Sequence, residues 1–223
     1  MAKKKKKGKC PYCGETRDLT SEHFIPRCLF SVVPADIETT VACGKCNAEK
    51  GKHDDYLRDI LIADWKVGTN STVQSLLDGK FARSVERNHS QFARVAKSNA
   101  KLEAVHSDGG IYLGHGYSVE LDSDRWSSAF SLIVRGLYHK LTRKFLPQAC
   151  SFDVRRISEV DFNNLWPEIE RIGYNGPYTL GEDVFMGIFI YAEEEPAISY
   201  WWLWFYNSIC ISVRTRPSDL ESE

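Results

Sequence analysis

Four cysteines near the start of the chain have the types and spacing of a metal site. Cys10 and Cys13 form one Cys-x-x-Cys pair, and Cys43 and Cys46 form a second. Thiolates two residues apart can bind one tetrahedral ion from a tight turn, and two such pairs close a four-sulfur site for Zn²⁺. Closed four-thiolate sites are structural, so we expect this zinc to stabilise the fold and not to do chemistry.

Three further polar side chains accompany the cysteines. Glu22 and His23 lie between the two pairs, and Asn47 directly follows the second pair. A plain zinc ribbon that binds a partner needs none of the three, so their presence favours catalysis. The alternative is a non-catalytic zinc ribbon that binds nucleic acid or protein, in which Glu22-His23 is incidental.

The elements that position these side chains can be predicted from their neighbours. Leu19 to Ser21 has strand character and leads into Glu22-His23, and Pro26 ends the local strand because proline lacks a donor N–H. A helix is expected to open at Asn47 to Lys52 and to continue from Asp54 to Trp65, where apolar residues recur every three or four positions. The cysteines would clamp a hairpin that carries Glu-His to a helix start that carries Asn.

The stretch of about residues 10–60 resembles the zinc-bearing HNH endonucleases, which have a ββα-metal core. The likeness includes both cysteine pairs, the acid-His followed by Ile-Pro, and the ending Cys-Asn-x-x-Lys-Gly. The resemblance implies that Glu22 and Asn47 hold a catalytic Mg²⁺ or Mn²⁺ and that His23 is the general base. By position, Asn47 corresponds to the last metal ligand of that family. The position of the family's middle Asn falls on Glu38, next to Thr39 and Thr40. Which of these residues replaces the middle Asn stays open.

These residue types suit phosphodiester hydrolysis. An imidazole with a pKa near neutrality can take the proton of water, and a hard cation held by few oxygen ligands keeps positions open for phosphate oxygens and water. Lys50 and Lys52 follow Asn47 closely and could steady the phosphate. The expected substrate is DNA, which most of the resembled family cuts, and RNA is not excluded.

A basic helix is expected over about residues 73–100, after a loop at residues 67–72. Its cationic side chains recur at near-helical spacing, so they form a stripe that either is solvated or contacts the phosphate backbone. The stripe includes Lys80, Arg83, Arg87 and Arg94.

The predicted class is α+β, with a zinc-stabilised HNH domain over residues 1–66 and an α+β accessory domain over residues 73–223. Helices are expected from Asp122 to Leu146 and from Asp161 to Ile172, followed by a strand-rich end in which Trp201, Trp202 and Trp204 are core residues. This second domain could sense a ligand or a regulatory protein and control the nuclease, as in phage defence or a mobile element.

Charge distribution and cysteine count bear on the partner and on the cellular compartment. The 223 residues carry a net charge of −1, but basic residues exceed acidic ones over residues 1–103 and the reverse holds afterwards, so the first part is the one expected to approach a polyanion. An odd count of seven cysteines with paired spacing indicates metal binding in a reducing cytoplasm. We expect neither a signal peptide nor a membrane span, and the sequence does not fix the oligomeric state.

Overall fold

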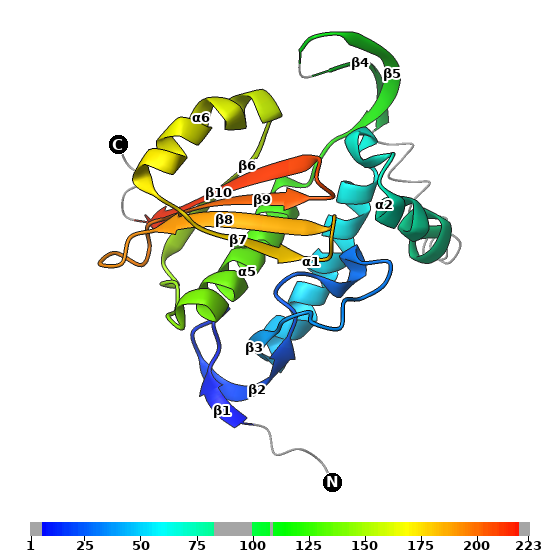
Figure 1. The fold of residues 1–223 in the computed structure, drawn as a ribbon. Coiled ribbons are helices and arrows are strands. Elements are labelled where there is room, and N and C mark those ends of the chain that lie inside the picture. Colours follow the sequence, from blue (N-terminus) through cyan, green and yellow to red (C-terminus); the bar gives the residue numbers. More distant parts are fainter. Residues whose placement is uncertain (1–5, 83–99, 108, 219–223) are drawn as a thin grey trace.

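The structure is a computed structural model that describes residues 6–82, 100–107 and 109–218. Its N-terminal part holds a three-stranded antiparallel sheet of β1 (Lys6–Lys9), β2 (Thr16–Glu22) and β3 (Thr40–Cys43), in that order (Figure 1). The helix α1 (Gly44–Ile62) follows β3 without a linker. The second cysteine pair therefore spans the junction, because Cys43 ends the strand and Cys46 lies in the first turn of the helix.

Short helical elements and a hairpin lie between the larger elements of the chain. A 3-10 turn, η1 (Arg27–Leu29), lies between β2 and β3, and η2 (Trp65–Val67) follows α1. Next come α2 (Ser71–Leu76) and a π-helical turn, η3 (Leu77–Phe81). The strands β4 (Ala100–His106) and β5 (Tyr112–Val119) form a separate antiparallel hairpin.

A five-stranded antiparallel sheet forms the C-terminal part, in the order β6–β10–β9–β8–β7. One helix precedes its first strand and another follows that strand (Figure 1). The bounds are α5 (Ser123–Thr142), β6 (Cys150–Ile157), α6 (Glu159–Ile172), β7 (Asn175–Leu180), β8 (Phe185–Tyr191), β9 (Ser199–Phe205) and β10 (Ile209–Pro217).

The two faces of this sheet carry two apolar layers, because successive strand residues point to opposite sides. On β9, Trp201 and Leu203 face the main core with α5, whereas Trp202 and Trp204 face α6. Figure 1 shows α5 and α1 on one side of the sheet and α6 on the other. The tryptophans are thus packing residues, as expected. The mixture of helices and antiparallel sheets confirms the α+β class.

One hydrophobic core joins the N-terminal residues to the C-terminal sheet. Phe24 and Ile25, which follow His23, and Leu57 of α1 lie in the same buried cluster as α5 and strands β8 to β10. The Tyr206 hydroxyl donates to the backbone oxygen of Leu29 at 2.9 Å across this contact. The two-domain division stays a prediction, but both parts pack on a single core.

Several element boundaries differ from expectation. Ala100 begins a strand and does not end a helix, because residues 100–106 pair with β5 over seven positions. The helix α5 ends at Thr142, before the expected Leu146, since Arg143 adopts a left-handed conformation with φ 61°. Its N-cap is Asp122, whose side chain accepts a hydrogen bond from the backbone N–H of Arg125. The edge strand β7 was not expected.

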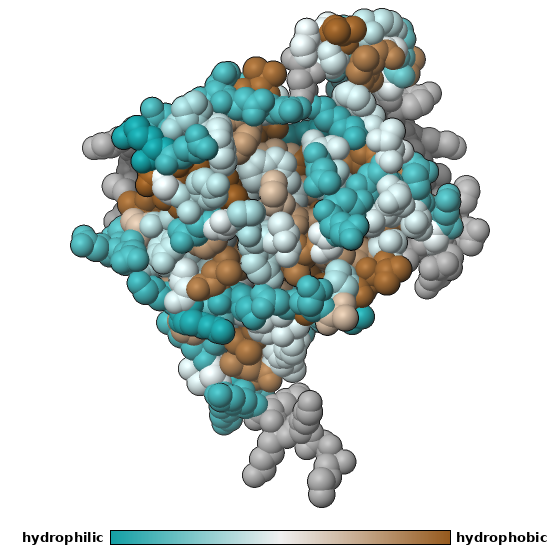
Figure 2. Space-filling model, in the orientation of Figure 1, coloured by the Kyte–Doolittle hydropathy of each residue, from teal (hydrophilic) through white to brown (hydrophobic). Residues whose placement is uncertain are grey.

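The exposed surface is mostly hydrophilic on the face drawn in Figure 2, with apolar residues on the β4–β5 hairpin that projects at the upper right. Leu102, Ile111, Tyr112 and Leu113 of this hairpin are each more than half exposed. Among the described helices, none combines the length and apolar character needed to cross a bilayer.

Candidate active site

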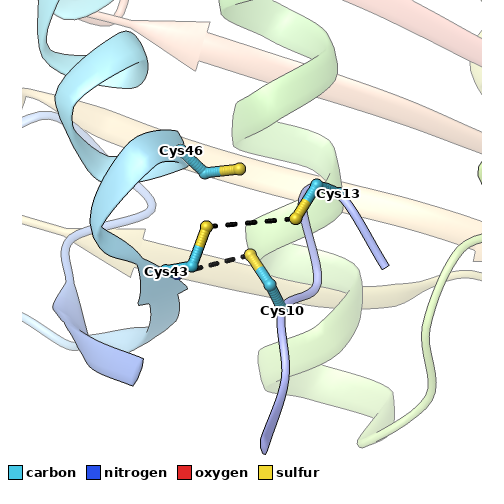
Figure 3. A group of neighbouring side chains, drawn as sticks. All are labelled: Cys10, Cys13, Cys43 and Cys46. Atoms are coloured by element: carbon cyan, nitrogen blue, oxygen red, sulfur yellow. Dashed lines mark hydrogen bonds between the residues drawn. The ribbon is translucent and has the colours of Figure 1, made fainter. Parts of the chain in front are cut away.

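The four cysteines of the two pairs gather in one cluster, with their thiols pointing toward one another (Figure 3). All four sulfur atoms lie within 4.8 Å of each other, and Cys13 Sγ is 3.9 Å from Cys43 Sγ. Sulfurs on one tetrahedral Zn²⁺ are about 3.8 Å apart when each Zn–S bond is about 2.3 Å. A disulfide would bring two sulfurs to about 2.05 Å. The cluster is therefore compatible with a structural zinc site.

The turn between β1 and β2 presents the first cysteine pair. The backbone N–H of Cys10 donates to Glu15 O at 2.9 Å, and that of Gly14 donates to Cys10 O at 2.8 Å. The backbone N–H of Cys43 donates to Cys10 Sγ at 3.4 Å, which links the two pairs. Burial, followed by the neighbouring sulfurs of Cys43 and Cys10, raises the pKa of Cys46. Four thiolates in this space would thus require a cation between them.

A glycine on α5 lets the cysteine cluster and the histidine segment pack closely. A Cβ placed on Gly136 would lie 2.5 Å from Phe24 Cβ and 2.8 Å from the Tyr12 hydroxyl. Tyr12 sits inside the first cysteine pair, and Phe24 follows His23. The absence of a side chain at Gly136 therefore positions both the metal-binding turn and the end of β2 against the same helix.

Glu22 on β2 and Asn47 on α1 each contact the facing element where the strand packs on the helix. Asn47 donates from Nδ2 to Thr20 Oγ1 at 3.2 Å, and Lys50 Nζ lies 3.4 Å from Glu22 Oε1. Thr20 and Glu22 are alternate residues on one side of β2, while Asn47 and Lys50 are one turn apart on α1. The two predicted oxygen ligands thus lie along the same strand–helix contact.

Lys50 lies at this strand–helix contact and is fully buried. Its ammonium lies 2.8 Å from both Oδ1 and Oδ2 of Asp54, in addition to its longer contact with Glu22. Burial raises the pKa of Glu22 and of Asp54, and the Lys50 ammonium opposes both shifts. The expected phosphate contact by Lys50 does not fit this position, because the ammonium is enclosed and already paired. Sequence reasoning assigned no role to Asp54.

His23 follows Glu22 at the end of β2 and is half-buried. Burial, and then the positive charges of Arg27 and Lys50, lower the pKa of its imidazole. A lowered pKa keeps the ring neutral at pH 7, and the neutral ring is the form that accepts a proton. The surroundings of His23 therefore suit a general base.

Glu38 and Thr40, which lie near the middle position of the resembled family, have separate partners. Glu38 accepts hydrogen bonds from the Tyr178 hydroxyl at 2.7 Å and from Lys140 Nζ at 3.1 Å, which ties it to the C-terminal part. Thr40 pairs with Glu22 across the β2–β3 ladder, and its hydroxyl lies 2.8 Å from His139 Nδ1. Thr40, and not Glu38, is the one next to Glu22.

Of the other basic residues expected to contact phosphate, some lie within the part of the chain that the structure describes and some lie outside it. Lys52 is well exposed, with 72% of its side chain accessible, and fits a contact with a phosphate. Arg83, Arg87 and Arg94 lie outside the described residues, as does the side chain of Lys80.

A second basic group lies near the cysteine turn and was not recognised in the sequence. Lys9 Nζ sits 5.0 Å from the ring centroid of Phe145, whose ring is 4.8 Å from that of His139. Arg143 and Lys144, just before Phe145, are exposed. Because Lys9 and Phe145 are far apart in the sequence, only the tertiary structure shows that Lys9 lies beside this segment.

Comparison with protein-family models, curated proteins and solved structures gives no match for this chain. The residues of this site and their contacts are therefore the basis for inferring a function.

Proposed function

We propose that the chain is a metal-dependent endonuclease of the HNH type that hydrolyses phosphodiester bonds in DNA. The observation that carries this proposal is the placement of Glu22 and Asn47 along the β2–α1 contact, with His23 directly after Glu22 and Cys46 directly before Asn47. A structural Zn²⁺ on the cysteines would fix the β1–β2 turn to the start of α1. DNA is the proposed substrate because most of the resembled family cuts DNA.

His23 is the proposed general base. The imidazole accepts a proton from a water molecule as the water oxygen forms a bond to phosphorus and the bond from phosphorus to the leaving oxygen breaks. The carboxylate of Glu22 and the side-chain oxygen of Asn47 are the atoms that would hold a divalent cation. When bound, Mg²⁺ or Mn²⁺ supplies stabilisation of the charge on the phosphate and on the leaving oxygen.

The proposal is tested with supercoiled plasmid and the zinc-loaded full chain in EDTA, Mg²⁺ or Mn²⁺. We expect cutting by the parent only with the divalent cation. His23→Ala should lower the rate by about 10²- to 10⁴-fold, the usual contribution of a general base. Replacing His106, an exposed histidine on β4, with Ala is the matched control and should leave the rate unchanged. Equal rates for His23→Ala and the parent would refute the catalytic assignment.

A non-catalytic binding module is the second candidate. The observation that favours it is the ion pair of Glu22 with buried Lys50, which gives the carboxylate a structural partner without any added cation. Such a module would bind DNA but leave it intact under every metal condition. Gel-shift binding without plasmid cutting would therefore support this candidate over the nuclease.

Control of the nuclease by the C-terminal part is a further proposal, and the shared core determines how it must be tested. Removing the residues after position 72 would expose Phe24, Ile25 and Leu57, which pack in the same core as the C-terminal sheet. A truncated chain is then expected to unfold. Regulation should be tested with the full chain, by comparing cutting rates with and without a candidate effector.

A further inference from the structure

The proposed nuclease site includes a buried cluster of one cation and two anions, to which Glu22 belongs. Lys50 Nζ is 2.8 Å from each carboxylate oxygen of Asp54 and 3.4 Å from Glu22 Oε1. Lys50 is fully buried, and the side chains of Glu22 and Asp54 are 10% and 19% exposed. With both carboxylates ionised, the three groups keep one uncompensated negative charge in a place of low solvent access.

The helix α1 sets the geometry of this cluster. Lys50 and Asp54 are four residues apart, so their side chains meet on one face of the helix. Asn47, one turn earlier, contacts β2 from the same face through Thr20. The ammonium therefore comes from α1 and is shared between Asp54 on its own helix and Glu22 on the facing strand.

The two carboxylates do not hold the ammonium equally. Asp54 binds the ammonium with both oxygens at 2.8 Å, which is a hydrogen-bond distance. The contact of the ammonium with Glu22 Oε1 is longer, at 3.4 Å. An uncompensated buried charge is unfavourable and attracts a further cation. Of the two carboxylates, Glu22 is therefore the one whose negative charge is less compensated by Lys50.

We propose that Asp54 is a positioning residue: by holding the Lys50 ammonium, it leaves the carboxylate of Glu22 free to bind the divalent cation. This inference rests on the proposed function, in which Glu22 is a ligand of that cation. Without the charge on Asp54, the buried ammonium would have Glu22 as its acidic partner, and the resulting neutral pair would bind a cation poorly.

A purely structural ion pair makes a different prediction, and a pair of variants separates the two. Asp54→Asn removes the competing acceptor and should turn Lys50 into an inhibitor of metal binding. Lys50→Met in the same chain then removes that inhibitor and leaves Glu22 charged. If Asp54 only stabilised the fold, the second substitution would not restore metal binding.

The experiment is a titration of Mn²⁺ into the zinc-loaded full chain, with free Mn²⁺ measured by electron paramagnetic resonance. Asp54→Asn should weaken Mn²⁺ binding by about 10- to 100-fold, the usual effect of losing an outer-shell partner of a metal ligand. The double variant Lys50→Met/Asp54→Asn should bind at least as tightly as the parent. Asp55→Asn, at the next position and with 67% of its side chain exposed, is the matched control and should bind as the parent does.

Parental affinity in Asp54→Asn, or a double variant that binds as weakly as Asp54→Asn, would overturn the inference. If Asp54→Asn alone fails to fold, as judged by zinc content and circular dichroism, the double variant decides, because the inference requires it to bind at least as tightly as the parent. Glu22→Gln separates the role of Asp54 from the existence of the cation site. Unchanged Mn²⁺ binding in Glu22→Gln, or none in the parent, would refute the cation site of the proposed function itself.

Discussion

The hydroxyl of Thr40 lies 2.8 Å from Nδ1 of His139, which joins the strand beside Glu22 to the last turn of the long helix α5. Thr40 is the direct partner of Glu22 in the β2–β3 ladder and is only 6% exposed. His139 also packs on Phe145, beyond the end of its helix. The C-terminal part therefore supports the candidate site through a specific polar contact as well as through apolar packing.

Removing this contact should destabilise the protein. His139→Ala leaves the buried Thr40 hydroxyl without this partner, which costs about 1–3 kcal/mol of unfolding free energy. Thr39→Val, at the next position, is the matched control and should change the unfolding free energy by less than about 0.5 kcal/mol. Urea unfolding of His139→Ala, Thr40→Val and the double variant gives the coupling energy, and strictly additive effects would show that the hydrogen bond contributes nothing.

Two glycine-to-alanine substitutions should act in opposite directions. Gly136→Ala forces a methyl group to within 2.5 Å of Phe24 Cβ and should cost about 1–3 kcal/mol through overpacking. The same clash moves the residue after His23, so the cutting rate should fall as well. Gly51→Ala on the exposed face of α1 meets nothing within 4 Å and should stabilise the helix by about 0.5–1 kcal/mol. Thermal unfolding measures both, and a neutral Gly136→Ala would contradict the close approach of α5.

The cysteine cluster should bind one zinc ion and contribute to stability. Cys43→Ser should lose the metal and lower the melting temperature by about 10 °C or more, since metal binding to such a site is also folding free energy. Cys28→Ser is the matched control, because Cys28 lies outside the cluster and its thiol donates to the backbone oxygen of Asp54. Zinc analysis of both variants is the measurement, and retention of one full equivalent by Cys43→Ser would contradict the four-thiolate site.

The cutting rate should depend on pH through His23. Only the neutral imidazole accepts a proton, so the rate should fall as the pH drops through its pKa, which burial, Arg27 and Lys50 place below the ordinary value of 6.5. Arg27→Ala removes a nearby positive charge, raises that pKa and moves the acid limb to higher pH. Arg17→Ala, near the start of β2, is the control. An acid limb that does not move in Arg27→Ala would show that another group is titrating.

The basic residues near the cysteine turn should contribute to DNA affinity. Lys144→Ala should lower the slope of log affinity against log salt by about 1, as expected for loss of one phosphate contact. Lys52→Ala tests the contact expected from the sequence in the same way. Arg171→Ala on α6, across the sheet from α5, is an exposed control that should leave the slope unchanged. Binding to a labelled duplex at several salt concentrations measures these slopes, and an unchanged slope in Lys144→Ala would remove this surface from the interface.

The sequence by itself determined the local features of the protein. Two Cys-x-x-Cys pairs bring thiols together through short turns, and apolar spacing in residues 54–65 predicts a helix, which the structure has as far as Ile62. Both features depend on residues only a few positions apart. The strand before Glu22 and the helix after Cys43 follow from the same short-range rules. The cysteine cluster and the α+β class could be predicted for this reason.

Only the tertiary structure decided which side chains meet across the chain. Lys50 looks like a surface lysine in the sequence, and its burial against Asp54 and Glu22 depends on how α1 packs on β2. The contact of Thr40 with His139 spans 99 positions and has no local signal. The edge strand β7 and the strand at Ala100 also escaped prediction, because strand pairing depends on partners elsewhere in the sequence. The charge balance of the candidate site is therefore a property of packing, not of the motif.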